Sequence, residues 1–332
     1  MLQHGAILQN VKKHIYIYSP SSAVRDKASF KRGVKRLQSL GHEVEIDPAA
    51  LAKHLRFAGD DATRLAAVHR AAASGADVAM ISRGGYGLTR MLPGINYKAL
   101  AKAVNGGMQF VGLSDFTALQ LALLAKTGAT TWAGPALGED FGIDGTPDDI
   151  MEACFDDLIT GQGEGTGWQL PKKPALVGAT DSIAMQSQKD WANGTFSIKN
   201  ATLWGGNLSV LVSLVGTPYL PAMKGGILFI EDVGEHPYRV ERMLTHLLHA
   251  GVLAQQKAII FGQFSNYKLV PGYDSGFNLA GVATRLQSQV KARVLTGLPF
   301  GHVATKVLLP VGQQVTLAVE GRDAFVLWGH QH

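Results

Sequence analysis

Residues 110–116 read Phe-Val-Gly-Leu-Ser-Asp-Phe, and this stretch predicts a buried strand that ends in a sharp turn carrying Ser114. Apolar residues then recur at near-helical spacing, which predicts an amphipathic helix directly after the turn. Backbone N–H groups at such a helix start can stabilise an oxyanion. The segment approximates the Gly-x-Ser-x-Gly elbow that presents a nucleophile, with Phe116 in place of the second glycine. A Ser-Asp pair that only caps the helix is the alternative.

Short apolar runs alternate with helical patterns from Ile15 to about Trp132, which is the signature of a parallel sheet with crossover helices. The expected strands include residues 15–18, 43–46, 78–81 and the run that delivers Ser114, and the expected helices include residues 63–73 and 97–104. Sites in such sheets form at the carboxyl ends of the strands. We therefore expect Ser114 and the glycine-rich loop of residues 82–87 to share one edge of the sheet.

The chain of 332 residues is too long for one typical core, and its pattern changes along its length. We expect an N-terminal α/β domain over residues 1–137, a junction over residues 138–200 where the periodicity weakens, and a C-terminal domain over residues 201–332. The last part should contain helices at 208–215 and about 240–248, strands at 226–230, 258–261, 293–295 and 306–309, and a hairpin at 315–328. The predicted fold class is α/β, with a flavodoxin-like parallel-sheet domain followed by a mixed α/β domain with an antiparallel hairpin.

Composition and charge exclude several classes of protein. Hydrophobic residues make up 46% of the chain and charged residues 17%, as in ordinary globular domains. The formal net charge of +5 comes from scattered lysines and arginines, so no nucleic-acid partner is expected. No apolar run approaches the roughly 20 residues of a membrane span. The N-terminus shows no export signal, so we expect a cytoplasmic protein without membrane contact.

The loop Arg83-Gly84-Gly85-Tyr86-Gly87 follows an expected strand, and its glycines allow the backbone to approach a ligand closely. Neither the spacing of a dinucleotide-binding loop nor that of a P-loop is present, which argues against a phosphate cradle. An N–H group of this loop, together with the N–H of Asp115, would form a two-sided oxyanion hole. A flexible connection that only needs glycine is the alternative.

A serine nucleophile needs a base within hydrogen-bond reach and a carboxylate that orients the base. His302 lies in a loop after an expected strand, where a catalytic base is reasonable, and His236 competes with it. His246 and His249 lie three residues apart on an expected helix, but the His-Glu-x-x-His motif is absent. We therefore expect no metal site.

Two carboxylates compete for the orienting role. Glu231 and Asp232 follow the apolar run 226–230, and a charge at the end of so apolar a strand needs a partner or solvent. Asn207 ends a second glycine-rich turn between a strand and a helix. Its side chain could face a cleft between the domains or cap the next helix, and the sequence leaves both readings open.

Five motifs, in order and approximate separation, resemble those of the LD-carboxypeptidase family of serine peptidases. They are Arg83–Gly87, Gly112–Asp115, Gly205–Asn207, Ile230–Asp232 and Gly301-His302. The resemblance implies that Ser114 is the nucleophile, His302 the general base and Glu231, rather than Asp232, the orienting acid. It also implies an oxyanion hole formed by the backbone of Gly85 and Asp115.

The family resemblance implies hydrolysis of the amide before a C-terminal D-amino acid, as in removal of D-alanine from muramoyl tetrapeptides during cell-wall recycling. It implies no cofactor and a homodimer. We expect Arg83 to bind the terminal carboxylate of the peptide, with Gly84, Tyr86 and Asn207 also lining the binding site.

Relatives in the same family include microcin self-immunity peptidases, which cleave acyl-sulfamoyl or phosphoramidate adenylates. Such a function needs an aromatic side chain that stacks on the adenine, and Trp191 and Trp204 are the candidates. A non-catalytic small-molecule binding protein is the rival from another class. A nucleotide-binding module is less favoured, because no phosphate-binding loop is present.

Overall fold

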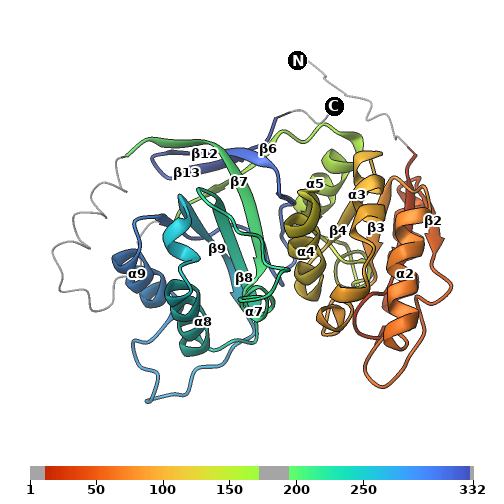
Figure 1. Ribbon diagram of the computed structural model, residues 1–332, viewed down its shortest axis with the longest axis horizontal. Coiled ribbons are helices and arrows are strands. Elements are labelled where there is room, and N and C mark those ends of the chain that lie inside the picture. Colours follow the sequence, from red (N-terminus) through yellow and green to blue (C-terminus); the bar gives the residue numbers. More distant parts are fainter. Residues whose placement is uncertain (1–11, 172–193, 330–332) are drawn as a thin grey trace.

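Two β-sheets lie side by side in the computed structural model, which describes residues 12–171 and 194–329 (Figure 1). Within this part of the chain, one sheet has six strands in the order β11-β5-β4-β3-β1-β2. The other has seven strands in the order β10-β9-β8-β7-β12-β13-β6. The fold class is therefore as predicted from the sequence, a mainly parallel sheet followed by a mixed one.

The first sheet is parallel except at one edge. Its strands are β1 (His14–Tyr18), β2 (Glu43–Ile46), β3 (Val78–Ile81), β4 (Gln109–Gly112), β5 (Thr131–Ala133) and β11 (Leu309–Val311). Its helices are α1 (Lys27–Ser39), α2 (Asp61–Ala73), α3 (Tyr97–Asn105), α4 (Thr117–Thr127) and α5 (Asp149–Thr160). Short turns of helix are η1 (Leu88–Arg90), η2 (Leu92–Gly94), η3 (Ser114–Phe116) and the π-helical η4 (Leu137–Phe141). The strands predicted at 43–46 and 78–81 are confirmed with the same bounds.

The second sheet combines parallel and antiparallel pairing around one long strand. Its strands are β6 (Gly165–Gln169), β7 (Phe196–Asn207), β8 (Ile227–Val233), β9 (Ala258–Ser265), β10 (Arg293–Leu295), β12 (Gln314–Glu320) and β13 (Asp323–Leu327). Its helices are α7 (Leu208–Ser213), α8 (Pro237–His249), η5 (Leu253–Gln255) and α9 (Leu279–Gln289). Strand β7 pairs parallel with β8 and antiparallel with β12, and β12 forms the predicted hairpin with β13.

Two segments pair differently from the sequence prediction. The strand expected at 306–309 begins only at Leu309, and it pairs antiparallel with β5 of the first sheet. In the stretch expected to be a junction, β6 pairs with β13 of the second sheet. Pairing of strands so distant in sequence leaves no local signal, because only the tertiary fold brings them together.

Helix α4 lies between the two sheets and is buried on all sides along its first two turns (Figure 1). It packs on β5 of the first sheet, and on β7 and α7 of the second half. The prediction of an amphipathic helix after Ser114 is therefore wrong in one respect, since residues 117–124 have no exposed face. A helix that is apolar all round is typical of a core position. Among the described residues, no helix is long and apolar enough to cross a membrane.

The end of β7 touches both β8 and the start of α4. Gly205 and Gly206 have φ values of +136° and +131°, which side chains other than glycine rarely adopt. A Cβ on Gly205 would lie 1.9 Å from the Phe229 carbonyl oxygen, and a Cβ on Gly206 would lie 2.5 Å from Thr117 Oγ1. These two positions therefore require glycine, since a side chain at Gly205 would push β7 away from β8 and one at Gly206 would push β7 away from the start of α4.

We predict that Gly205→Ala lowers the free energy of unfolding by about 2–4 kcal/mol, because backbone strain and a steric clash add at this position. Urea denaturation followed by circular dichroism measures the change. Gly216→Ala is the matched control, because Gly216 also has a positive φ (+79°) but no atom within 4 Å of the added Cβ. Equal losses in the two variants would contradict the packing argument.

Candidate active site

Ser114 occupies a strained turn between β4 and α4. Its φ is +65°, a left-handed value that is uncommon for a residue other than glycine. Strain of this kind persists only where the surrounding structure enforces it, and it is concentrated at functional sites. A Cβ on Gly84 would lie 2.6 Å from the Ser114 Cβ and 2.7 Å from its Oγ, so the glycine leaves room for the serine side chain. The structure thus brings Ser114 against the loop of residues 82–87.

The side chain of Asp115 ties this turn to two neighbouring loops. Its carboxylate is buried, and Oδ2 accepts hydrogen bonds from Ser21 Oγ at 2.7 Å and from the Leu88 N–H at 2.8 Å. Burial raises the pKa of Asp115, against the opposing effect of these hydrogen bonds. The side chain of Asp115 is therefore held by two neighbouring loops, which fixes the turn that contains its N–H.

Ser22 fixes the conformation of the glycine-rich loop. Gly85 has a φ of +98°, and a Cβ there would lie 2.1 Å from Ser22 Oγ. The same hydroxyl accepts a hydrogen bond from the Tyr86 N–H at 3.2 Å, and the Ser22 N–H donates to the Gly84 carbonyl at 3.3 Å. The loop is therefore an ordered structure that only glycine at position 85 permits. A purely flexible connection does not describe it.

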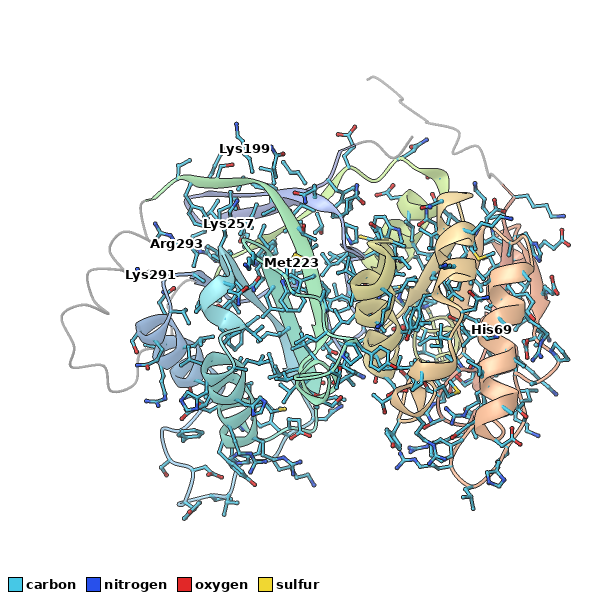
Figure 2. The ribbon with its side chains drawn as sticks, viewed as in Figure 1. His69, Lys199, Met223, Lys257, Lys291 and Arg293 are labelled. Atoms are coloured by element: carbon cyan, nitrogen blue, oxygen red, sulfur yellow. The ribbon has the colours of Figure 1, made fainter. Side chains whose placement is uncertain are left out.

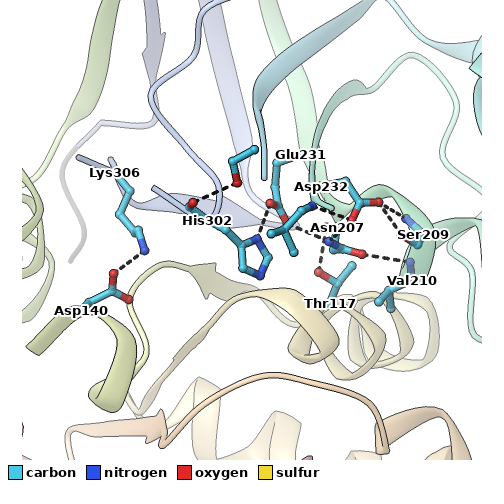
Figure 3. A network of polar contacts seen from close by, with 11 residues as sticks. Thr117, Asp140, Asn207, Ser209, Val210, Glu231, Asp232, His302 and Lys306 are labelled. Atoms are coloured by element: carbon cyan, nitrogen blue, oxygen red, sulfur yellow. Dashed lines mark hydrogen bonds and ion pairs between the residues drawn. The ribbon is translucent and has the colours of Figure 1, made fainter. Parts of the chain in front are cut away.

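Glu231 and His302 form a hydrogen-bonded pair at the end of β8 (Figure 3). His302 Nδ1 lies 2.8 Å from Glu231 Oε2, and the Glu231 carboxylate is fully buried. With Nδ1–H donating to the carboxylate, Nε2 of the neutral imidazole is an acceptor. A Cβ on Gly301 would lie 3.3 Å from the Glu231 Cβ, so the glycine before His302 lets the loop approach the strand.

The competing residues have other partners. Asp232 accepts hydrogen bonds from the N–H groups of Ser209 and Val233, at 2.9 and 2.8 Å. Burial raises the pKa of Asp232, and the charge of Glu231 raises it further against the hydrogen bonds from Ser209. His236 lies 3.0 Å from Asp274 through Nε2 and caps α8. Asp232 therefore does not orient His302, and His236 does not pair with Glu231.

Asn207 connects Glu231, Asp232 and the start of α7 (Figure 3). Its Nδ2 donates to Glu231 Oε1 at 3.1 Å and to Asp232 Oδ1 at 3.0 Å. Its Oδ1 accepts from the Val210 N–H and caps α7, which is one of the two predicted roles of Asn207. The pairing of β8 with β9 shifts register between Ile230 and Asp232, as a β-bulge does, and a bulge re-aims neighbouring side chains.

The serine turn and the histidine pair are joined by a short chain of hydrogen bonds. The Asn207 N–H donates to Thr117 Oγ1 at 3.0 Å, and Thr117 begins the helix that follows the Ser114 turn. The chain then continues from the Asn207 side chain through Glu231 to His302. Residues from both halves of the protein therefore meet at one place.

Sequence reasoning missed a buried ion pair beside His302. Lys306 Nζ contacts Asp140 Oδ1, and both side chains are almost fully buried (Figure 3). Asp140 belongs to η4 and Lys306 to the loop after His302, so the pair fastens this loop to the first half. A lysine beside the apolar run 307–309 was the only signal in the sequence. Such a charge needs a partner when it is buried.

The remaining predicted residues, Arg83, Tyr86 and the two tryptophans, have different surroundings. Arg83 donates through Nη1 to the Ala23 carbonyl at 3.3 Å, and its Nη2 lies 3.6 Å from Glu139 Oε1. Tyr86 is half exposed and packs on Phe57. Trp204 is fully buried and donates to Gln256, so it is a core residue in this structure. Trp191 lies outside the described residues.

The chain matches known proteins over most of its length. Residues 15–134 match the LD-carboxypeptidase N-terminal domain and residues 200–317 match the LD-carboxypeptidase C-terminal domain. A Bacillus subtilis protein named "Probable murein peptide carboxypeptidase" is 28% identical over 87% of this chain and 84% of its own length. The Escherichia coli microcin C7 self-immunity protein MccF is 26% identical over 74% of this chain and 72% of its own length.

A solved structure shares the fold over nearly the whole chain. The muramoyltetrapeptide carboxypeptidase from Oxalobacter formigenes superposes with a TM-score of 0.79 at 36% sequence identity. The similarity covers 95% of this chain and 98% of that one. The two-sheet architecture described above is therefore the architecture of that enzyme as well.

We predict that Glu231→Gln lowers the pKa of His302. Burial alone lowers this pKa, but the hydrogen bond and the charge of Glu231 outweigh burial and raise it above its usual 6.5. The substitution removes the negative charge of Glu231, and the hydrogen bond and charge of Glu231 are the main effects that raise the pKa of His302. The lowering effect of burial then dominates, so the imidazole should lose its proton at lower pH. An NMR titration of the histidine ring signals measures the shift.

Asp274→Asn is the control for this titration, because Asp274 contacts His236 and not His302. The control should leave the His302 pKa unchanged. An unchanged pKa in Glu231→Gln would contradict the assignment of Glu231 as the residue that sets it.

Proposed function

The chain belongs to the LD-carboxypeptidase family, and we propose that it is a serine carboxypeptidase that hydrolyses the amide before a C-terminal D-amino acid. Family membership gives the coarser statement, a general carboxypeptidase function and therefore a hydrolase. The finer proposal rests on one observation above all. The paired Glu231 and His302 are linked through Asn207 and Thr117 to the strained turn of Ser114.

In the proposed reaction, Ser114 Oγ attacks the carbonyl carbon of the scissile amide while His302 Nε2 accepts the hydroxyl proton. Glu231 holds Nδ1–H and stabilises the imidazolium that forms. The N–H groups of Gly85 and Asp115 donate to the oxyanion of the tetrahedral intermediate. His302 then gives its proton to the leaving nitrogen, and the C–N bond breaks to leave an acyl-enzyme on Ser114.

Water completes the cycle with the roles of His302 reversed. The imidazole takes a proton from the water as its oxygen attacks the ester carbonyl, and returns a proton to Ser114 Oγ when the acyl group leaves. Because the neutral imidazole is the base, the reaction requires a pH above the raised pKa of His302. The rate should therefore fall as the pH drops below that value.

The proposed substrate is a muropeptide that ends in D-alanine, and the proposed process is cell-wall recycling. This choice is supported by similarity to the Bacillus subtilis protein named as a probable murein peptide carboxypeptidase and to the muramoyltetrapeptide carboxypeptidase from Oxalobacter formigenes. Arg83 would bind the terminal carboxylate, with Gly84, Tyr86 and Asn207 near the peptide. The protein would act in the cytoplasm as a homodimer without cofactor or metal, and light scattering of the purified protein measures the oligomeric state.

We further propose the domain division drawn from the sequence, in which residues 1–137 carry the nucleophile and residues 201–332 carry the glutamate and the histidine.

A microcin-type self-immunity peptidase is the second candidate function, and similarity to the Escherichia coli protein MccF favours it. Cleavage of an acyl-sulfamoyl adenylate by the purified protein tests that candidate. A non-catalytic binding protein would release no product from either substrate class.

We predict that the wild-type protein releases D-alanine from a muramoyl tetrapeptide and that Ser114→Ala lowers kcat about 10⁴-fold or more, because the nucleophile is lost. Chromatographic detection of free D-alanine measures both rates. Ser39→Ala is the matched control, since Ser39 is exposed on α1 and bonds only to its own helix. Full activity of Ser114→Ala would exclude Ser114 as the nucleophile.

We predict that Arg83→Ala raises KM for the tetrapeptide about tenfold, because a charge-assisted contact with the terminal carboxylate is lost. Steady-state kinetics separates KM from kcat. Lys31→Ala removes an exposed charge on the outside of α1 and should leave both constants unchanged. Unchanged KM and kcat in Arg83→Ala would reject the proposed role.

A further inference from the structure

Three arginines lie in three loops at the edge of the first sheet, and one of them, Arg83, precedes the glycine that contacts Ser114. Arg25 follows β1, Arg56 follows β2 and Arg83 follows β3. These strands are neighbours in the sheet order β3-β1-β2, so their carboxyl ends meet at one edge. Three cationic side chains thus come from the same edge of the sheet that carries Ser114.

Ala23 holds the three loops together. Its N–H donates to the Arg56 carbonyl at 2.9 Å, and its carbonyl accepts from Arg83 Nη1 at 3.3 Å. Arg25 follows two residues later in the same loop. The residue after Arg83 is Gly84, which lies against the Ser114 side chain. The loops that carry the arginines are therefore connected to one another and, through Gly84, to the Ser114 side chain.

Arg56 is held beside the glycine-rich loop by an aromatic side chain. Its Cζ lies 6.0 Å from the centre of the Tyr86 ring, and the Tyr86 ring packs on Phe57 with 5.9 Å between ring centres. Tyr86 is 45% exposed, so one part of its surface remains open to a ligand. A guanidinium over an exposed ring is oriented without being neutralised.

The positive charges exceed the negative charge near them. Arg83 is paired with Glu139 at 3.6 Å, but Arg25 and Arg56 are exposed and have no carboxylate partner among the described residues. Burial lowers the pKa of Arg83, and the charges of Arg25 and Arg56 lower it further while Glu139 raises it. Asp26, which follows Arg25, caps α1 and lies 3.9 Å from Arg32. The three arginines and Glu139 then carry a net charge of +2, which two carboxylates of a ligand would balance.

Several other arginines of the same half contact carboxylates. Arg64 and Arg90 both contact Asp61, and Arg70 contacts Asp47. Arg36 donates to the backbone carbonyls of Phe141 and Gly145, whereas Arg25 and Arg56 are exposed and contact no carboxylate among the described residues. Figure 2 labels further cations, Lys199, Lys257, Lys291 and Arg293, but these belong to the C-terminal half.

We propose that Arg25 and Arg56 form a second anion subsite beside Arg83, which binds an internal carboxylate of a peptide substrate in addition to its terminal one. This inference rests on the proposed function for the position of the peptide. It makes the preferred substrate an acidic peptide with at least two carboxylates. Because the contacts are partly exposed, the preference should weaken as the ionic strength rises.

The test compares two peptides of the same size: L-Ala-γ-D-Glu-meso-diaminopimelyl-D-Ala, and its analogue with both internal carboxylates amidated. Binding to Ser114→Ala is measured by calorimetry, with and without the added substitutions Arg25→Gln and Arg56→Gln. We expect the acidic peptide to bind about tenfold more tightly, the size of two partly exposed charge pairs, and the added substitutions to abolish this difference. Lys257→Gln with Lys291→Gln removes the same charge from the C-terminal half and should leave the difference intact.

The two proposals can fail separately. Equal affinity of Ser114→Ala for both peptides, or a preference that survives Arg25→Gln and Arg56→Gln, would overturn the subsite. Hydrolysis is followed independently with the wild-type protein. If it releases no D-alanine but the charge preference depends on the two arginines, the proposed reaction fails and the subsite stands.

Discussion

A hydrogen bond from the Asn207 N–H to Thr117 Oγ1 joins the two halves of this protein, and the rest of the site depends on it. It is possible only because Gly206 lets the backbone of β7 reach the first turn of α4. The first two turns of the helix begun by Thr117 are buried on every side, so the position of the helix cannot adjust independently of either sheet. The distance between the serine turn and the Glu231–His302 pair is consequently set by core packing.

The site places several polar groups in an apolar interior, and each needs a partner. Asn207 satisfies this requirement with one amide, whose two N–H groups serve Glu231 and Asp232 while its oxygen caps α7. Asp115 plays a similar part on the other side, where its carboxylate collects donors from Ser21 and Leu88. Buried networks of this kind specify one arrangement when every member is paired, and each member becomes costly when a partner is removed. The same contacts therefore support the fold and align the candidate site.

The sequence was sufficient to predict individual strands and turns, but it did not predict which distant strands pair or which side chains contact one another. Strands β2 and β3, the turn at Ser114 and the hairpin of β12 and β13 follow from periodicity and turn residues. Helix α5 was missed although its buried apolar residues have helical spacing, because glycine and aspartate surround it. The complete burial of α4 depends on a second sheet that its own residues do not reveal. Individually, Ser114, Glu231 and His302 could be chosen as candidates, but only the tertiary fold shows that Glu231 contacts His302 while Asp232 contacts Ser209.

Strand β11 completes the first sheet but is synthesised long after the other five strands of that sheet. During translation the first five strands emerge early, yet the edge strand that pairs with β5 lies some 180 residues further along the chain. At about 5–20 residues per second, the ribosome needs roughly 10–40 s to deliver it. Until then β5 has unpaired backbone groups at an open sheet edge, which is a template for association with other chains. The nascent protein therefore carries an additional open sheet edge at β5 until the segment of β11 leaves the exit tunnel.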